Sequence, residues 1–480
     1  NSGANMGKDI LAIAVGRLAV TSLSEARTVV DKLYTYVNSS PSGQWKNRVL
    51  MVADDEDYGQ HLDQTEKMVA HMAAAGFGGK MTYSKVYLDS YVKSGSVYPG
   101  ARTDMFRALD DGVVWWNFIG HANPTSWTHD GLMTYTDVNS LYLRRWPFVY
   151  AATCDFLRWD ASTTSAAELL FSNPNGGVIG VVSATRPVYI SENGYLSASI
   201  GKHLFDTDGD GLNLTVGEAI RRGKNGYDEG KGVVSNHNKL RYVFLGDPAM
   251  RLATPVNNAV VSSINGDDID SYDPPVIKAA QDAVVEGYLA DSDGNLMTDF
   301  SGVVETTVYD AETSVTTRAN GEHGVESVYD QRGLRLYAGT DSVRHGRFRL
   351  KVAMPVEISD NYRPAEMTLY ARSGDGREAI GVNRAFYVYG YDDTAVPDTV
   401  APVIEELYLN HSTFRNGDRV NESPVVIARL SDDRAINLSM AGIGHQMTMW
   451  LDTPSKVFTD VSLYYTPSAD GTPSGTVAYP

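Results

Sequence analysis

The sequence predicts an α/β domain with a mainly parallel sheet, followed by domains built only from β-strands. Up to about residue 255, apolar runs of strand length alternate with segments of helical spacing, for example at Ala26, Val29, Val30 and Leu33. Beyond that point, short alternating runs are broken by Asp-Gly and Asn turn signals. Parallel strands are buried on both faces, so the unbroken apolar runs favour a parallel sheet covered by helices.

The elements expected in the first half follow from these runs. The predicted strands cover 9–16, 47–53, 113–120, 147–152 and 177–184. The predicted helices cover 24–37, 65–76, 104–112 and 165–171, and Gly76 is a stop signal for the second of them. Six of the seven tryptophans precede residue 160, which also indicates that this half is one globular unit.

The second half is predicted to hold β-sandwich domains of the immunoglobulin type. Runs such as 283–314 and 346–358 alternate apolar and polar residues between turn signals. Residues 392–402 have the composition of a linker. We therefore expect an α/β domain at 1–255, a β-sandwich at 256–391, and a linker with a second β-rich domain at 392–480. The chain starts at Asn1 and stops abruptly, so we expect a piece of a longer protein with a truncated last domain.

Composition excludes several classes of function. The formal net charge of −18 disfavours nucleic acid as a partner, because phosphate binding needs basic clusters. No run of about 18 apolar residues suggests a membrane span. Cys154 is the only cysteine, so no intrachain disulfide can form. A free cysteine is ordinarily a small buried hydrophobe, and on the pattern alone this alternative to a catalytic thiol is open.

Two predicted strands end in polar turns that carry reactive side chains. His121 follows the strand at 113–120, and Cys154 follows the strand at 147–152. Sites in open α/β sheets lie outside the carboxyl ends of the strands. An imidazole beside a thiol promotes thiolate formation, which makes the pair a candidate base and nucleophile. We expect Gly120 to leave room for a substrate backbone, and the backbone at Gly120, Ala122 and Cys154 to form an oxyanion hole.

The first 255 residues resemble the gingipain-type cysteine peptidases. The matching stretches are NFIGHA and AATCDF, with His121 and Cys154 spaced as in that family, and also GVIGVVSAT, VFLGDPAMRLATP and IAVGRLAV. The resemblance implies a caspase-like fold with Cys154 as nucleophile. Two later stretches, DSDGNLMTDFSG and AINLSMAGIGHQM, are similar to a narrower group. This group is the gingipain-like C-terminal signal peptidases of the type IX secretion system in Bacteroidetes.

The resemblance also implies roles for two residues after the second predicted strand. The family has an acidic residue near the histidine, and Asp54 stands at that position, where gingipains have glutamate. Asp55 and Glu56 are alternatives, and so is a solvated acidic loop without a role. Tyr58 stands where arginine-specific gingipains carry an acidic residue that reads the substrate. Specificity for Arg is therefore not implied.

The narrower resemblance implies an activity at the cell surface. The chain is expected to remove the C-terminal secretion domain from cargo proteins at the outer face of the outer membrane, alongside other components of that secretion system. Either water or an amine of anionic lipopolysaccharide would accept the acyl group. No cofactor is required. The alternative from another class is a non-catalytic cell-surface binding or scaffold protein with a relict peptidase domain.

A last motif is acidic. Asp206, Asp208 and Asp210 take the first, third and fifth places of a Ca²⁺ loop, and Glu218 stands one residue beyond the twelfth place. A structural Ca²⁺ ion is one interpretation. The other is a polar turn before a helix that Thr215 and Glu218 open as a capping box.

Overall fold

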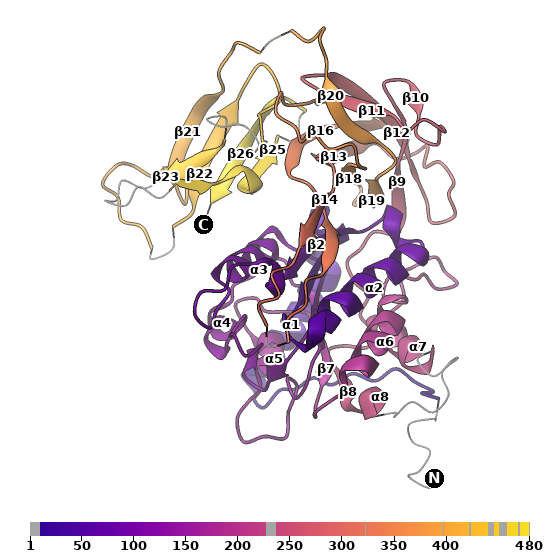
Figure 1. The fold of residues 1–480 in the computed structure, drawn as a ribbon, viewed down its shortest axis with the longest axis vertical. Helices are drawn as coiled ribbons and strands as arrows, with labels where there is room; N and C mark the ends of the chain where they lie inside the picture. The colour runs from indigo at the N-terminus through magenta and orange to yellow at the C-terminus, as the bar shows by residue number, and fades with distance from the viewer. Residues whose placement is uncertain are drawn as a thin grey trace. The chain divides into compact units, whose positions relative to one another are not determined.

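The computed structural model describes residues 10–226, 237–321, 323–396, 398–421, 424–439, 446–450, 458–468 and 471–479 (Figure 1). The chain divides into two compact units. Unit 1 comprises Asn1–Val256 and Ser314–Tyr329, and unit 2 comprises Asn257–Thr313 and Asp330–Pro480. Among the described residues, no helix combines the length and the apolar character that a membrane crossing requires.

Unit 1 is built on a six-stranded sheet with the order β2-β1-β3-β6-β7-β8. Its strands are β1 (Arg48–Ala53), β2 (Thr82–Tyr87), β3 (Trp115–Ile119), β6 (Phe148–Ala152), β7 (Gly180–Ala184) and β8 (Tyr242–Leu245). All neighbours pair in parallel except β8, which runs antiparallel to β7. Strands β3, β6 and β7 are buried along their whole length, as their unbroken apolar runs predict. The predicted mainly parallel sheet is confirmed.

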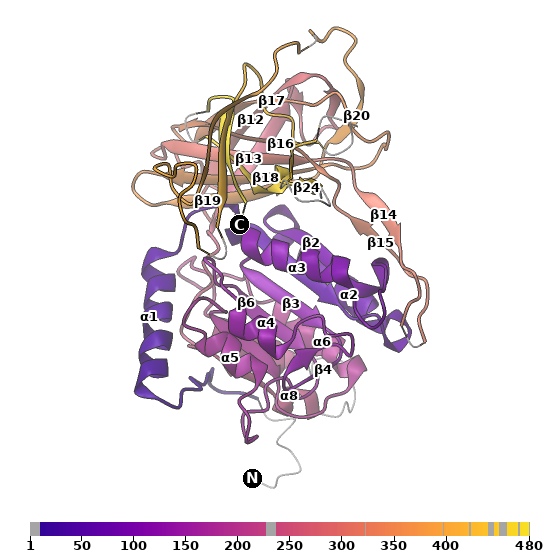
Figure 2. The same cartoon turned by 90° about the vertical axis from the view of Figure 1, so that its left-hand side faces the viewer.

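Helices cover both faces of this sheet (Figures 1 and 2). They are α1 (Leu23–Ser39), α2 (Gln60–Ala74), α3 (Pro99–Asp111), α4 (Tyr135–Ser140), α5 (Ala166–Ser172), α6 (Ile190–Gly201), α7 (Val216–Gly226) and α8 (His237–Arg241). Helices α1, α3, α4 and α5 share one apolar cluster with Trp116 of β3. On the other face, a Cβ added to Gly201 of α6 would meet Met68 of α2 and Trp115 of β3. Successive strand residues thus serve opposite helix layers.

One predicted strand of unit 1 is wrong, and two strands were not predicted. The strand expected at 9–16 is absent from described residues 10–16, and Arg17 makes only an isolated bridge with Leu245. Ile10 and Ile13 in this segment are exposed, so its apolar residues are not buried by a sheet. Strands β2 and β8 were not predicted. β2 mixes polar and apolar residues, and the apolar run of β8 is only 4 residues long.

The main sheet of unit 2 closes on itself. Its order is β10-β9-β12-β17-β16-β13-β18-β19, and β19 pairs again with β9. The strands are β9 (Asn257–Ile264), β10 (Asp267–Asp268), β12 (Asp282–Ala290), β13 (Gly302–Tyr309), β16 (Arg335–Arg344), β17 (Arg347–Ala353), β18 (Glu366–Ser373) and β19 (Glu378–Asn383). A closed sheet therefore replaces the predicted immunoglobulin-like sandwich. Both architectures have strands with one buried face, so alternation in the sequence does not separate them.

A smaller sheet follows in the same unit. Its order is β21-β22-β26-β25, from β21 (Val403–Leu409), β22 (Val426–Ser431), β26 (Ser474–Tyr479) and β25 (Tyr465–Pro467). It lies in the region predicted to be β-rich, beyond the proposed linker.

Part of a hairpin from the β-rich sequence belongs to unit 1. Strands β14 (Thr313–Thr316) and β15 (Val328–Gln331) pair with each other, and the segment Ser314–Tyr329 packs with the α/β unit. Asp89, at the end of β2, is only 7% exposed and anchors this segment. Its carboxylate accepts the backbone N–H of Ala319 at 3.1 Å and of Asn320 at 2.6 Å. The sequence had assigned these residues to the domain at 256–391.

Candidate active site

Two neighbouring strands bring His121 and Cys154 to the same edge of the sheet. Ile119 of β3 pairs with Ala152 of β6, and the Gly120 N–H continues the ladder by donating to the Ala152 carbonyl at 3.3 Å. His121 and Cys154 each stand two residues beyond this pair. Adjacent strands are about 5 Å apart, so the two residues follow neighbouring strand ends. This is the carboxyl edge, where sites form in parallel sheets.

The Cys154 thiol contacts the backbone of Val188. The Val188 N–H donates to Sγ at 3.3 Å, and the thiol lies 3.7 Å from the Val188 carbonyl oxygen. Both Cys154 and His121 lie in the described part of the chain, and no hydrogen bond joins Sγ to the imidazole ring. In this conformation the two side chains occupy neighbouring strand ends without a direct bond.

Carboxylates and two other imidazoles surround the His121 ring. Its Nε2 lies 2.9 Å from Oδ2 of Asp57 and 3.5 Å from Oε2 of Glu56. The His61 ring approaches it edge-on with centroids 5.3 Å apart, and the His129 ring stacks on it at 5.4 Å. The His121 side chain is 34% exposed, so a substrate can reach it.

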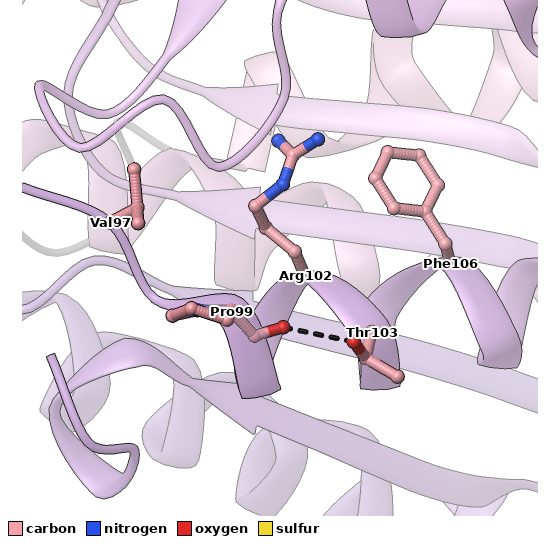
Figure 3. Close-up of a pocket in the computed structure, with 5 residues that line it drawn as sticks. All are labelled: Val97, Pro99, Arg102, Thr103 and Phe106. Carbon is pink, nitrogen blue, oxygen red and sulfur yellow. Dashed lines mark hydrogen bonds between the residues drawn. The ribbon is translucent and has the colours of Figure 1, made fainter. Parts of the chain in front are cut away.

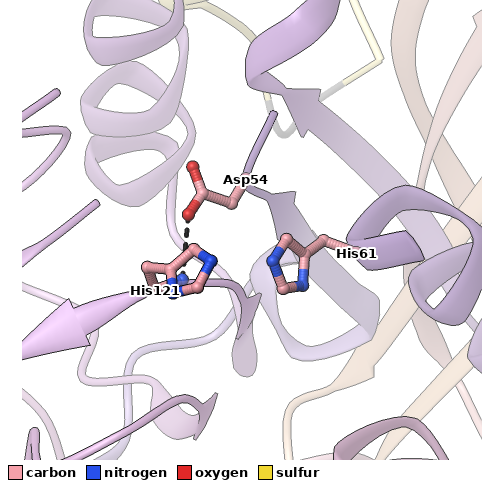
Figure 4. Close-up of side chains that lie close together, drawn as sticks. All are labelled: Asp54, His61 and His121. Atoms are coloured by element: carbon pink, nitrogen blue, oxygen red, sulfur yellow. Dashed lines mark hydrogen bonds between the residues drawn. The ribbon is translucent and has the colours of Figure 1, made fainter. Parts of the chain in front are cut away.

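Asp54 binds the backbone of His121 and not its ring, which corrects the role expected from the sequence. Its Oδ2 accepts the His121 N–H at 2.9 Å (Figure 4). Its Oδ1 accepts the Asp55 N–H at 3.1 Å. Asp54 directly follows β1, and its own N–H donates to the Ile119 carbonyl at 3.0 Å, so its position is set by the sheet. Burial raises the pKa of Asp54 well above its ordinary value, while the His121 N–H opposes that rise.

The loop that presents Asp57 to the ring has a left-handed backbone. The φ angles are 58° at Asp57, 58° at Tyr58 and 72° at Gly59. Such conformations are costly outside glycine, and they concentrate at functional sites. His61 Nε2 lies 3.3 Å from the Asp57 Oδ2, and this contact, with a contribution from His121, lowers the pKa of Asp57 to about 2. Asp57 is therefore ionised at neutral pH.

The sequence analysis gave neither Asp57 nor His61 a role in the site. Asp57 precedes α2 and His61 lies in its first turn, and the left-handed backbone between them brings the two side chains together, so no helical spacing signals this contact. The His129 side chain is 72% exposed, and its Nδ1 lies 3.2 Å from Oε1 of Glu56.

Only glycine fits at position 120, because Asp54 packs closely against it. A Cβ at this position would lie 2.5 Å from the Asp54 Cβ and 2.8 Å from the Phe118 ring. The space that the sequence assigned to a substrate backbone is occupied by Asp54. The Gly120 N–H is also used in the strand ladder, so it does not serve an oxyanion. The Cys154 N–H donates no hydrogen bond to a described residue, and an oxyanion role for Cys154 and Ala122 stays a prediction.

Tyr58 faces the hairpin segment Ser314–Tyr329. Its side chain is exposed, and its ring stacks on His323 with centroids 4.9 Å apart and planes inclined by 15°. At the hairpin tip, a Cβ on Gly321 would lie 2.3 Å from the Asp55 carbonyl oxygen. The hairpin therefore borders the loop that carries Asp57 and Tyr58. The sequence pattern held no signal for this long-range contact.

Two carboxylates of the acidic loop have protein partners. Asp208 Oδ2 lies 2.8 Å from Arg251 Nη1, and Asp206 Oδ2 lies 2.7 Å from His203 Nδ1. Asp206, Asp208 and Asp210 are all described, and they belong to none of the described residue groups that could hold a metal ion.

Glu218, the fourth residue of that motif, serves its own helix. Its N–H donates to Thr215 Oγ1 at 3.2 Å, as the capping alternative expects. Its carboxylate contacts Arg221 at 2.7 Å and Arg222 at 2.8 Å, and the Arg221 hydrogen bond chiefly lowers the pKa of Glu218 to about 2. Calcium binding at this loop stays a prediction.

A separate hollow opens at the start of α3 (Figure 3). It is lined by Val97, Pro99, Arg102, Thr103 and Phe106. Thr103 Oγ1 donates to the Pro99 carbonyl at 3.0 Å, and the Arg102 guanidinium is paired with Asp137 at 2.8 Å. None of the lining residues contributes to the cluster around His121.

Comparison with known proteins identifies the family of the chain. The family model for peptidase family C25 matches residues 2–253, more than half of the chain. Among solved structures, the chain is similar to the Arg-specific cysteine proteinase gingipain R, with 16% identity over 78% of this chain and 75% of that chain and a TM-score of 0.44. It is also similar to dimeric latent PorU from Porphyromonas gingivalis, with 22% identity over 100% of this chain and a TM-score of 0.35.

This chain spans only 39% of the length of that PorU chain. No curated protein matches it. The match over 2–253 is sufficient for assignment: the chain belongs to peptidase family C25, the gingipain family of cysteine peptidases.

Proposed function

We propose that the chain is an endopeptidase in which Cys154 is the nucleophile and His121 its base. The supporting observation is that the single cysteine and His121 follow neighbouring, in-register strand ends within the C25 match. Cys154 attacks the scissile carbonyl while His121 takes the thiol proton, and His121 then protonates the leaving amine. The Asp57 carboxylate holds the imidazole in orientation through the contact at Nε2.

Catalysis in this scheme requires the thiol to leave Val188. Sγ is held by the Val188 N–H at 3.3 Å, so Cys154 must turn toward His121 before attack. The same contact favours a second candidate, a non-catalytic binding or scaffold protein in which the thiol stays at Val188. The two candidates differ in whether a substrate-like reagent can draw the thiol out.

We further propose that the substrates are cargo proteins of a type IX secretion system. The sequence stretches at 291–302 and 435–447 support this narrower assignment, although 440–445 lie outside the described residues. The chain would cut off the C-terminal secretion domain at the cell surface, on the outer face of the outer membrane, with other components of that system as partners. Water or an amine of anionic lipopolysaccharide would then receive the acyl group.

A peptide probe with a thiol-reactive group tests the first proposal. We expect it to label Cys154, and labelling to be lost in the Cys154→Ala and His121→Ala variants. Labelling that is equally fast in His121→Ala would contradict the dyad and favour the binding protein.

Mass spectrometry tests the second proposal. A cargo protein with its C-terminal secretion domain is incubated with the chain, and the new C terminus is identified. Cleavage at the domain boundary supports the assignment, and an added amine at that terminus identifies transfer. If the probe labels the enzyme but the cargo stays intact, the proposed substrate is contradicted and the proposed Cys154–His121 dyad still stands.

A further inference from the structure

Three side chains from separate elements converge beside the catalytic base. Asp54 follows β1, His61 lies in the first turn of α2, and His121 follows β3 (Figure 4). One donor atom from each residue lies within 4.8 Å of the other two. The two imidazoles and the carboxylate thus form a compact set of potential metal ligands.

His61 is the unusual member of this set. It is 2% exposed, and neither of its ring nitrogens makes a hydrogen bond within the described structure. Its Nε2 lies 3.3 Å from Asp57 Oδ2, but this contact is not aligned as a hydrogen bond. Nearly all buried polar groups are hydrogen-bonded, so the buried Nδ1 of His61, which has no such contact within the described structure, indicates that something else satisfies it. A metal ion would do so.

The donor types indicate which metal would bind. Two imidazole nitrogens and one carboxylate oxygen suit Zn²⁺, whereas Ca²⁺ and Mg²⁺ prefer oxygen ligands alone. Zn–N and Zn–O bonds of about 2.0–2.2 Å place the ligand atoms of a tetrahedral site roughly 3.4 Å apart. The ligand atoms already lie within 4.8 Å of one another, so only small side-chain movements are required. Three protein ligands leave the fourth position to water.

We propose that Asp54, His61 and His121 form a Zn²⁺ site that reversibly inhibits the peptidase. A metal-bound nitrogen of His121 has no lone pair for the thiol proton. The inhibition rests on the proposed function, in which His121 is the base. The binding of the metal does not rest on it, because Cys154 is not a ligand.

Metal binding is tested in the full chain carrying Cys154→Ala. Co²⁺ serves as a spectroscopic substitute for Zn²⁺, and we expect visible d–d absorption without the charge-transfer band of a thiolate ligand. Excess Zn²⁺ should displace the Co²⁺. The additional variants His61→Gln and Asp54→Asn should each weaken binding by more than about 100-fold, the upper range for losing an outer-shell partner.

Two histidine variants serve as matched controls. His71→Gln changes an exposed histidine on the same helix, and His129→Gln changes the ring that stacks on His121. Both should leave the Co²⁺ affinity unchanged. Circular dichroism checks that every variant is folded. If His61→Gln does not fold, the metal affinity of Asp54→Asn tests the site.

The outcomes separate this site from the proposed function. Absence of Co²⁺ absorption in Cys154→Ala, or affinity that depends on His129 and not on His61, would overturn the site. Zn²⁺ should abolish activity of the wild-type chain, and a chelator should restore it. Binding without loss of activity would overturn the inhibitory role. A chain that binds Co²⁺ as expected but cleaves no substrate even after chelation would contradict the proposed peptidase function while the site stands.

Discussion

His121 and Asp57 are joined by a side-chain contact of 2.9 Å between Nε2 and Oδ2. Asp54, the acidic residue that the family resemblance indicates, instead accepts the backbone N–H of His121. The two carboxylates therefore have separate tasks: Asp57 orients the imidazole, and Asp54 fixes the turn that carries it. This division of tasks leads to the first prediction.

Asp57→Asn should lower kcat/KM by about 10²–10⁴-fold, mainly through kcat, because the base loses its orienting anion. Asparagine tolerates the left-handed backbone at this position, so the loop should keep its shape. Asp54→Asn should lower kcat/KM less than Asp57→Asn does, because the asparagine amide oxygen can still accept the His121 N–H. Steady-state kinetics on a cargo-derived substrate measure both, and Asp57→Glu should recover part of the activity. A larger loss in Asp54→Asn than in Asp57→Asn would reverse the assignment.

Gly120→Ala should destabilise unit 1 by about 1–3 kcal/mol, the usual cost of overpacking. The new methyl group would lie 2.5 Å from the Asp54 Cβ. Either the backbone at position 120 or the Asp54 side chain must therefore move. Thermal unfolding measures the effect. The control is Gly79→Ala, whose Cβ would meet no atom within 4 Å and which should change stability by less than about 0.5 kcal/mol. Equal melting temperatures for Gly120→Ala and wild type would show that the packing is looser than described.

Lys32 should make stability depend on pH between neutral and alkaline conditions. It is 5% exposed, and its Nζ donates to the carbonyls of Phe171, Asn173 and Gly176 at 2.6, 3.4 and 3.1 Å. Burial lowers the pKa of Lys32 to about 7. Between that value and the ordinary pKa of about 10.4, the unfolded chain binds a proton that the folded chain lacks, so stability rises with pH.

The free energy of unfolding of Lys32→Met, compared with wild type at pH 7 and pH 9, tests this effect. Loss of the donor should cost about 1–3 kcal/mol at pH 7, because buried carbonyls lose their partner. The difference from wild type should grow at pH 9. An exposed lysine, Lys202, provides the control variant Lys202→Met. A difference that is the same at pH 7 and pH 9 would show that the three carbonyls keep Lys32 charged in the folded protein.

Short peptide reporters with Arg or Lys at P1 should be poor substrates. Tyr58 provides no carboxylate, and the neighbouring carboxylates of Asp57 and Glu56 are engaged with His121 and His129. A buried guanidinium without a counter-charge is costly. Small or polar P1 residues should give the higher kcat/KM, with Cys154→Ala as the blank. Strong hydrolysis of an Arg reporter that is lost in Cys154→Ala would contradict this specificity and confirm the nucleophile.

Much of the α/β architecture was predictable because its signals are local. The runs at 113–120 and 147–152 became β3 and β6, and four predicted helices became α1, α2, α3 and α5. Residues directly after a buried strand share its edge of the sheet, so His121 and Cys154 could be placed from the sequence. β8 and β2 were missed because β8 has only 4 residues and β2 mixes polar with apolar residues. Both are strands because they form hydrogen bonds with neighbouring strands of the sheet.

The sequence by itself determined which residues stand at the strand ends, because strand length and apolar burial are read over a few residues. Tertiary structure alone decided which carboxylate meets the His121 ring, since the left-handed turn at Asp57 and Tyr58 redirects the loop. It also decided that β19 closes on β9 and that Ser314–Tyr329 joins unit 1. These relationships join residues far apart in the chain, and their free energy depends on contacts that no local periodicity encodes.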